Sequence, residues 1–349
     1  MANQSDLIQP EATEAPESKK RAIETRITLG QFLDAYGIIL VLVLMMLGLT
    51  LLQPEYFLTV ENLTNVARQT AVNAMLALGE FLVILTAGID LSVGSVMALS
   101  MIVLALAVHS DVPSVLAIVL ALAAGAGCGL LNGWGLTKLR LPHPFISTLA
   151  MLNIARGATF LLSGGVPISG LPPEVRFWGA GDIPLFNIGE TQVVFPVIML
   201  VVLAFYVIFW VILSRMPLGR HVYAVGGNPQ AALYSGINVN RVLNIVYVLC
   251  GILAAVGGIL LAGRTNSGYP NAGTGAELDA IAAVIIGGSS FFGGRGTVVG
   301  TFVGALIMGL LRNGLNLMNV SAFWQFIVIG IVIVAAAFAD VLRQRSVRV

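Results

Sequence analysis

Charged side chains are scarce in this chain of 349 residues. Only 18 lysines and arginines and 17 aspartates and glutamates are present, which is 10% of the residues, whereas a soluble domain carries about 25%. A water-soluble globule of this size could not cover its surface with so few charges, so an ordinary soluble enzyme is excluded. The formal net charge of +1 gives no reason to expect a nucleic acid or a strongly acidic partner.

Residue types that carry catalysis or bind metals are also few and scattered. The two cysteines, Cys128 and Cys250, lie inside apolar runs and are expected to be packing residues. The three histidines stand in three different loops, so no metal cluster is visible. None of the three lysines follows a glycine, so the phosphate-binding Gly-Lys-Ser/Thr loop is missing. We expect no enzymatic chemistry, no cofactor and no metal in this chain.

Apolar residues are abundant instead, at 57% with a mean hydropathy of +0.93. A helix that spans a bilayer needs about 20 mostly apolar residues. Ten apolar runs are separated by glycine, proline, asparagine and charge clusters, near 35–52, 66–87, 93–109, 113–135, 145–163, 193–213, 242–263, 279–292, 297–315 and 322–341. This pattern predicts an all-α fold, a polytopic membrane helix bundle of about ten transmembrane helices.

The distribution of charge predicts the domain organisation. We expect a disordered cytoplasmic tail over 1–33, a transmembrane domain over 34–342 and a cytoplasmic C-terminal tail over 343–349. With the N-terminus inside, most of the 18 basic residues fall on the cytoplasmic side, as the positive-inside rule requires. An even number of spans then makes both termini cytoplasmic.

A polar segment, Thr86 to Ser95, separates the second and third runs and contains Asp90. An ionisable group at membrane depth is costly unless it is partnered or faces water. Asp90 could cap the third helix at the cytoplasmic interface, helped by Ser92, which is the commoner role for such a residue. It could also belong to a broken helix that lines a pathway, together with Gly94. The two roles are compatible.

Other polar or small residues inside the runs predict helix packing. Helix-to-helix hydrogen bonds, rather than ligand contacts, are expected for Asn73, Glu80, Asn132, Asn153 and Arg156. Small residues are dense over 121–127 and 293–309, which predicts close helix approach and fits a translocator better than a one-pass receptor. The eighth run is short, and the glycines that end it, among them Gly287 and Gly288, predict a broken or half-depth helix.

Two loops are long. The inner one, 214–241, contains Asn228 as a plausible N-cap and Pro229 at the first helical position, which predicts a short helix over Gln230 to Tyr234 that Gly236 stops. A short helix in a basic cytoplasmic loop suits a cytoplasmic partner. The outer loop, 164–192, is proline-rich and is expected to be stiff, with a short surface helix. Composition alone leaves a channel, a secondary transporter and an ABC permease open.

Several segments taken together resemble the permease subunits of bacterial ABC sugar importers of the ribose type, the carbohydrate uptake transporter 2 family. They are residues 85–95, 219–229, 235–237, 281–288 with 293–296, and 313–317 followed by Trp324-Gln325. The flanking span pattern extends the resemblance over almost the whole membrane domain.

The resemblance implies a homodimeric, multi-pass permease in the lipid of the bacterial cytoplasmic (inner) membrane. It implies a cytoplasmic ATP-binding protein with two fused nucleotide-binding domains, which would hold the ATP and magnesium, and an extracytoplasmic sugar-binding protein. It implies import by alternating access. The cargo stays open between a ribose-like pentose, a hexose and inositol. The alternatives are a branched-chain amino-acid ABC permease and an ion-coupled secondary sugar carrier.

The resemblance also assigns roles to residues. The coupling loop to the ATPase would comprise Gly219, Arg220, Gly226, Gly227, Asn228, Pro229 and Gly236. The candidates for a pathway or a helix break are Asp90, Ser92, Gly94, Gly287, Gly288, Gly293 and Gly294. From topology alone, the outer stretches 164–192 and 264–278 are candidates for meeting the binding protein.

Overall fold

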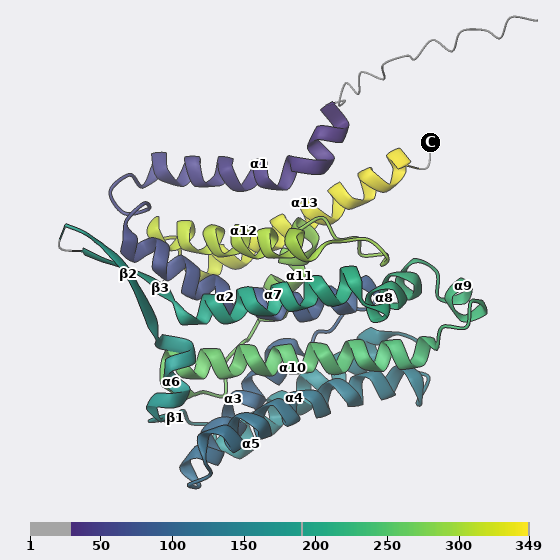
Figure 1. Ribbon diagram of the computed structural model, residues 1–349, viewed down its shortest axis with the longest axis horizontal. Coiled ribbons are helices and arrows are strands. Elements are labelled where there is room, and N and C mark those ends of the chain that lie inside the picture. The colour runs from purple at the N-terminus through teal and green to yellow at the C-terminus, as the bar shows by residue number, and fades with distance from the viewer. Residues whose placement is uncertain (1–28, 190, 348–349) are drawn as a thin grey trace, which may run out of the picture.

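Figure 1 shows the computed structural model, which describes residues 29–189 and 191–347. Most of this part of the chain is helical. The helices are α1 (Leu29–Leu52), α2 (Val60–Leu85), α3 (Val93–His109), α4 (Ser114–Thr137), α5 (Pro144–Ser163), α6 (Pro173–Ala180), α7 (Val197–Arg215), α8 (Pro217–Gly227), α9 (Pro229–Tyr234), α10 (Val239–Thr265), α11 (Ala276–Ile286), α12 (Val298–Leu317) and α13 (Ala322–Val347). The strands are β1 (Ile168–Ser169), β2 (Asp182–Ile188), β3 (Thr191–Pro196) and β4 (Ser267–Gly268).

Each of the ten apolar runs coincides with a helix. By length and composition, α2, α4, α5, α7, α10 and α12 can cross a membrane, and shorter apolar helices cover Gly37–Leu52, Val93–His109 and Ala322–Phe338. The polytopic helical bundle is therefore confirmed. α11 has 11 residues, which is about 16 Å of helix and about half of a bilayer core, so the eighth run forms a helix too short to span a bilayer.

The ends of the chain lie mostly outside the described residues. Residues 1–28 of the expected N-terminal tail and residues 348–349 of the C-terminal one are among those not described. α1 begins at Leu29 and α13 continues to Val347, so helix extends into both segments expected as tails. Neither extension contains a proline that would stop the helix.

The bundle is built around α10, which packs against α2, α3 and α4. A Cβ added to Gly125 of α4 would lie 2.3 Å from the carbonyl oxygen of Gly251 in α10, and one added to Gly251 would lie 2.1 Å from that of Gly125. One turn further along α4, a Cβ on Gly129 would lie 2.1 Å from the carbonyl oxygen of Tyr247. The backbones of α4 and α10 are therefore in contact, and the close approach predicted from the small residues is confirmed.

One end of the bundle carries the strands and α6 (Figure 1). β1 pairs antiparallel with β4, and β2 pairs antiparallel with β3 in a hairpin that projects from the bundle. α6 is the surface helix expected in the outer loop. The hairpin was not expected from the sequence, because Pro184 in β2 and Pro196 in β3 argue against strands. The all-α class holds for the bundle, to which these strands are added.

The opposite end carries α8 and α9 (Figure 1). The beginning of the described part of α1 and the end of α13 lie at this same end. This arrangement is the one expected for a chain whose two ends emerge on one side of the membrane.

Candidate functional site

The stretch expected to be a coupling loop is a pair of helices, α8 and α9. Gly219, Arg220, Gly226 and Gly227 belong to α8, which begins at Pro217. The sequence did not predict α8, because three glycines in eleven residues are poor helix formers. Tertiary contacts hold this helix where its own propensity does not.

α9 is the short helix that the sequence predicts. The side-chain oxygen of Asn228 accepts a hydrogen bond from the amide of Ala231 at 3.0 Å, and Pro229 occupies the first helical position. Gly236, with a φ of +83°, ends the turn that follows. The predicted cap, start and stop of this helix are confirmed.

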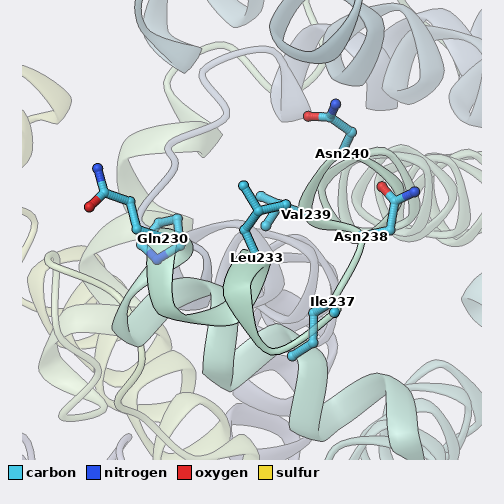
Figure 2. Close-up of a pocket in the computed structure, with 8 residues that line it drawn as sticks. Gln230, Leu233, Ile237, Asn238, Val239 and Asn240 are labelled. Atoms are coloured by element: carbon cyan, nitrogen blue, oxygen red, sulfur yellow. The ribbon is translucent and has the colours of Figure 1, made fainter.

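The outer surface of α9 is open and partly apolar. Tyr234 is 89% exposed and Leu233 is 59% exposed. A cavity of about 590 Å³ lies between α9 and the start of α10 (Figure 2), and its lining consists of Pro229, Gln230, Leu233, Gly236, Ile237, Asn238, Val239 and Asn240. Exposed aromatic and apolar groups beside a cavity are typical of a surface that a protein partner covers.

The buried face of α8 contacts two other segments, the end of α2 at Leu85 and the glycine-rich turn after α11. A Cβ on Gly226 would lie 1.7 Å from the carbonyl oxygen of Leu85, at the end of α2, and 2.7 Å from the amide nitrogen of Gly294. The Gly294 amide itself donates to the Leu85 carbonyl at 2.9 Å. Three segments that are far apart in the sequence therefore meet with their backbones in contact.

A tyrosine side chain reinforces this contact. The hydroxyl of Tyr223 in α8 donates to the carbonyl of Gly296 at 2.9 Å. Burial raises the pKa of Tyr223, so its hydroxyl remains a neutral donor. This hydrogen bond therefore links α8 to the turn after α11.

The glycines after α11 form that turn. α11 ends before Gly287, and Gly288, Gly293 and Gly294 have positive φ values of +83°, +80° and +68°. The same turn also contacts α13, because the hydroxyl of Ser290 donates to a carboxylate oxygen of Asp340 at 3.2 Å. α11 therefore ends where these glycines begin, and the turn that they form contacts both α8 and α13. A role of the glycines in a pathway stays a prediction.

Asp90 lies in a buried turn between α2 and α3 and is 2% exposed. Its Oδ1 accepts from the amide of Ser92 at 2.8 Å and from the Ser92 hydroxyl at 2.5 Å. Its Oδ2 accepts from the side-chain amide nitrogen, Nδ2, of Asn132 in α4 at 3.3 Å. The expectation that Asp90 caps α3 needs correction: the N-cap is Ser92, whose backbone is already helical and whose hydroxyl makes no cap hydrogen bond. That hydroxyl donates to Asp90 and accepts from the side-chain amide of Asn132.

The turn around Asp90 carries further buried polar groups. The backbone amide of Asp90 donates to Glu80 of α2 at 3.0 Å, and a Cβ on Gly88 would lie 2.7 Å from the hydroxyl of Tyr247. Glu80 Oε2, Asn132 Oδ1 and the Tyr247 hydroxyl are buried without a hydrogen-bond partner among the described residues. Asp90, Ser92 and Gly94 are all buried in this conformation, so their place in a pathway stays a prediction.

The other polar residues in the runs have mixed outcomes. Asn132 of α4 bonds Asp90 in the turn before α3 and the N-cap residue Ser92, so it joins α4 to the start of α3 and not to another helix along its length. Asn153 does not form the expected bond to another helix: it is exposed, and among the described residues its side chain donates to Leu149 of its own helix, at 3.0 Å. Arg156 donates to the carbonyls of Pro270 and Ala272, at 2.7 Å each, and so binds a loop instead of a helix.

Pairs that join helices also include groups that the sequence did not single out. Arg312 of α12 donates from Nε to Asp279 of α11 at 2.8 Å. Asn62 of α2 and Asn313 of α12 exchange two side-chain hydrogen bonds, at 3.2 and 2.7 Å. Arg312 and Asp279 are separated by 33 positions, so no local spacing could have indicated the pair.

The two outer stretches proposed to meet a binding protein adjoin each other. β1 pairs with β4, and the amide of Leu171 donates to the side chain of Asn266 at 2.9 Å. Arg68 of α2 forms an ion pair with Asp182 at the base of the hairpin. The two stretches therefore form one surface at the end opposite α8 and α9 (Figure 1).

A bundle with six helices long and apolar enough to cross a bilayer is the architecture of a multi-pass membrane protein. The family described as branched-chain amino acid transport system / permease component matches residues 62–337, and the chain belongs to this family.

Curated relatives cover nearly the whole chain. The ribose import permease protein RbsC of Escherichia coli (strain K12) is 44% identical over 89% of this chain and 95% of its own length. RbsC of Bacillus subtilis (strain 168) is 44% identical over 91% and 93%. The D-allose transport system permease protein AlsC of Escherichia coli (strain K12) is 38% identical over 90% and 94%. The resemblance to ribose-type ABC permeases is thus confirmed. No solved structure matches the chain.

Proposed function

We propose that this chain is the permease subunit of an ABC importer that moves a monosaccharide across the bacterial cytoplasmic membrane. The observation that carries this proposal is the 44% identity to a ribose import permease over 89% of the chain. A second relative, named for D-allose, extends the cargo class from a pentose to a hexose. ATP hydrolysis is assigned to a separate protein, because the chain has no phosphate-binding Gly-Lys-Ser/Thr loop.

We further propose about ten spans with both termini cytoplasmic. The end that carries α8 and α9 is the cytoplasmic one, because exposed basic residues gather on the connections that belong there. They are Lys138, Arg140, Arg215, Arg220, Arg241 and Arg295. Positive charge is retained on the cytoplasmic side of short loops.

The α8–α9 pair is the proposed docking element for an ATP-binding protein with two fused nucleotide-binding domains. A homodimer of this permease would present two such pairs, one for each domain. The exposed Leu233 and Tyr234 supply apolar contact area, and the exposed Arg220 supplies charge. The surface of β1, β4, α6 and the hairpin, at the opposite end, is the proposed site for an extracytoplasmic sugar-binding protein.

The packing of α8 suggests how force reaches the pathway. ATP-driven closure of the partner would move α8, and Gly226 and Tyr223 would transmit the movement to Leu85 and Gly296 by direct contact. Leu85 precedes the turn that holds Asp90, and Gly296 precedes α12. Two pathway elements would therefore shift together, as alternating access requires.

The test is uptake of radiolabelled ribose, allose, galactose, inositol and leucine by vesicles. The vesicles contain the permease with its neighbouring ATPase and binding protein, with and without ATP. Uptake of one sugar that requires both ATP and the binding protein is the expected result. Uptake of leucine alone would favour the second candidate, a branched-chain amino-acid permease, which the family description supports. Sugar uptake by the permease alone, driven by an ion gradient, would overturn the ABC assignment.

A further inference from the structure

The chain after α10 turns back into the bundle before α11 begins. A Cβ on Gly268 would lie 2.9 Å from the carbonyl oxygen of Met101 in α3, whereas one on Gly273 would lie 2.6 Å from that of Gly94. Between Gly268 and Gly273 the chain therefore runs alongside α3 from Met101 back to Gly94. These two α3 residues are seven positions apart, which is about 10 Å of helix. Residues 269–275, which we call the re-entrant loop, thus lie below the strand-bearing end and inside the bundle. Non-helical backbone at membrane depth is tolerated only against protein or a water-filled cavity.

α5 holds this loop in place with Arg156. The guanidinium Nη1 donates to the carbonyls of Pro270 and Ala272, which lie on either side of Asn271. Asn271 and Thr274 remain exposed. The Thr274 hydroxyl donates to the Asn271 carbonyl at 2.9 Å, which closes the loop into a compact turn.

The side of α5 next to this loop is polar at mid-helix. Asn153 is the tenth of 20 residues in α5 and is exposed, and it precedes Arg156 by three positions, so both lie on the same side of the helix. One turn further, a Cβ on Gly157 would meet nothing within 4 Å. An exposed amide beside open space at mid-membrane is costly against lipid tails.

We propose that this polar face, Asn153 and Gly157 of α5 with Asn271 and Thr274 of the re-entrant loop, is a wall of the aqueous pathway that contacts a polyhydroxylated substrate. The Asn153 amide uses one N–H on the Leu149 carbonyl and keeps its second N–H and its oxygen, and the Thr274 hydroxyl, which donates to Asn271, keeps its acceptor lone pairs. Together with the Asn271 amide they offer both donors and acceptors to sugar hydroxyls. Arg156 is a positioning residue, because its two bonds go to the loop carbonyls. The cargo class in this inference rests on the proposed function.

The first test measures whether Asn153 faces water. Asn153→Cys is made in the complete transporter in vesicles and exposed to a charged methanethiosulfonate and to an uncharged maleimide. The matched control is Ile154→Cys: Ile154 is the adjacent residue, 62% exposed, but it points about 100° away around the helix. The parent protein, with Cys128 8% and Cys250 0% exposed, gives the background.

We expect the charged reagent to modify the Asn153→Cys thiol at least tenfold faster than the Ile154→Cys thiol, because the charged reagent reaches a thiolate only through water. Modification by the maleimide alone would place Asn153 against lipid and overturn the proposal. No modification by either reagent would place it in a protein contact, such as one with a second copy, and would overturn it as well. This result does not depend on the cargo, so it stands even if no sugar is transported.

The second test separates substrate contact from assembly. Asn153→Leu and Thr274→Val are each expected to lower sugar uptake roughly five- to tenfold, the effect of losing one hydrogen bond. ATP hydrolysis stimulated by the loaded binding protein should stay unchanged. Asn153→Ser, which keeps a donor and an acceptor, should recover part of the uptake, and Ile154→Val should match the parent. Equal loss of uptake and of stimulated ATP hydrolysis would show a structural role only and overturn the assignment of substrate contact.

Discussion

The α carbon of Gly226 packs directly against the carbonyl oxygen of Leu85, so closely that a Cβ at residue 226 would lie 1.7 Å from that oxygen. The neighbouring Gly227 is exposed, and a Cβ there would meet nothing within 4 Å. The two adjacent glycines therefore have different reasons to be small. Only the first is required by the contact between α8 and the end of α2.

Gly226→Ala should destabilise the protein, because the backbones of α8 and α2 must move apart. Overpacking of this kind costs about 2 kcal/mol. We expect a lower melting temperature in detergent and reduced coupling of ATP hydrolysis to uptake. Gly227→Ala is the control and should lower neither, because a Cβ there meets nothing within 4 Å and alanine favours helix. Equal behaviour of the two variants would contradict the packing described.

Arg220→Glu tests the docking role of α8. Arg220 is exposed at the proposed cytoplasmic end, so reversing its charge should leave the permease folded in the membrane while it weakens capture of the ATPase and lowers uptake several-fold. The measurement is co-purification of the ATPase at low and high salt, because a surface charge contact is screened by salt. Lys138→Glu makes the same change of charge on another connection at the proposed cytoplasmic end and should retain capture. Normal capture and uptake in Arg220→Glu would refute the assignment of α8.

Asp90→Ala should lower folded yield without changing sugar preference. The substitution leaves the Ser92 amide, the Ser92 hydroxyl and the Asn132 amide without their acceptor, at a cost of about 3 kcal/mol in all. Thermal melting of the purified variant measures the loss, and competition between labelled sugars measures preference. A changed preference at normal yield would instead place Asp90 in the pathway.

A double substitution separates the hydrogen bond from other effects at this site. Asp90→Asn replaces the acceptor oxygen Oδ2 by an N–H donor that faces the side-chain nitrogen of Asn132, which is also a donor. This substitution should be destabilising. Adding Asn132→Asp reverses the two partners and should recover part of the melting temperature. Additive losses in the double variant would show that the two side chains are not coupled.

Most helices of the bundle could be predicted from the sequence because each carries an apolar run long enough to be recognised alone. The short helix α9 was also predictable, since Asn228, Pro229 and Gly236 are local signals. α8 was not, because its glycines argue against a helix and are explained only by what they pack against. The contact of Gly226 with Leu85 and Gly294 joins three distant segments, and no spacing within one segment indicates it.

The polar residues also divide into features that a local sequence signal indicates and features that depend on packing between distant segments. Asp90 was recognisable as a special position, but its partner Asn132 comes from another helix. Asn153 was expected to bond a neighbouring helix, and the structure instead leaves it exposed beside the re-entrant loop. A sequence places such a residue on a helix, whereas the direction it faces depends on how the helices pack.

The ion pair between Arg312 and Asp279 should be important for holding α11 against α12. The Asp279 side chain is 12% exposed and that of Arg312 is 36% exposed. Arg312→Met removes the cation and leaves a largely buried carboxylate without its partner, which should cost about 3 kcal/mol and lower the melting temperature. Arg312→Met combined with Asp279→Leu removes the stranded charge and should recover much of that loss.

The ion pair between Arg68 and Asp182 provides the comparison. Its side chains are 25% and 31% exposed, so solvent screens the charge that Arg68→Met would leave, and the cost should be below about 1 kcal/mol. Melting curves of the three variants in one detergent measure the order of stability. An equal loss for Arg312→Met and Arg68→Met, or no recovery in the double variant, would mean that burial of Asp279 does not determine the strength of the link between α11 and α12.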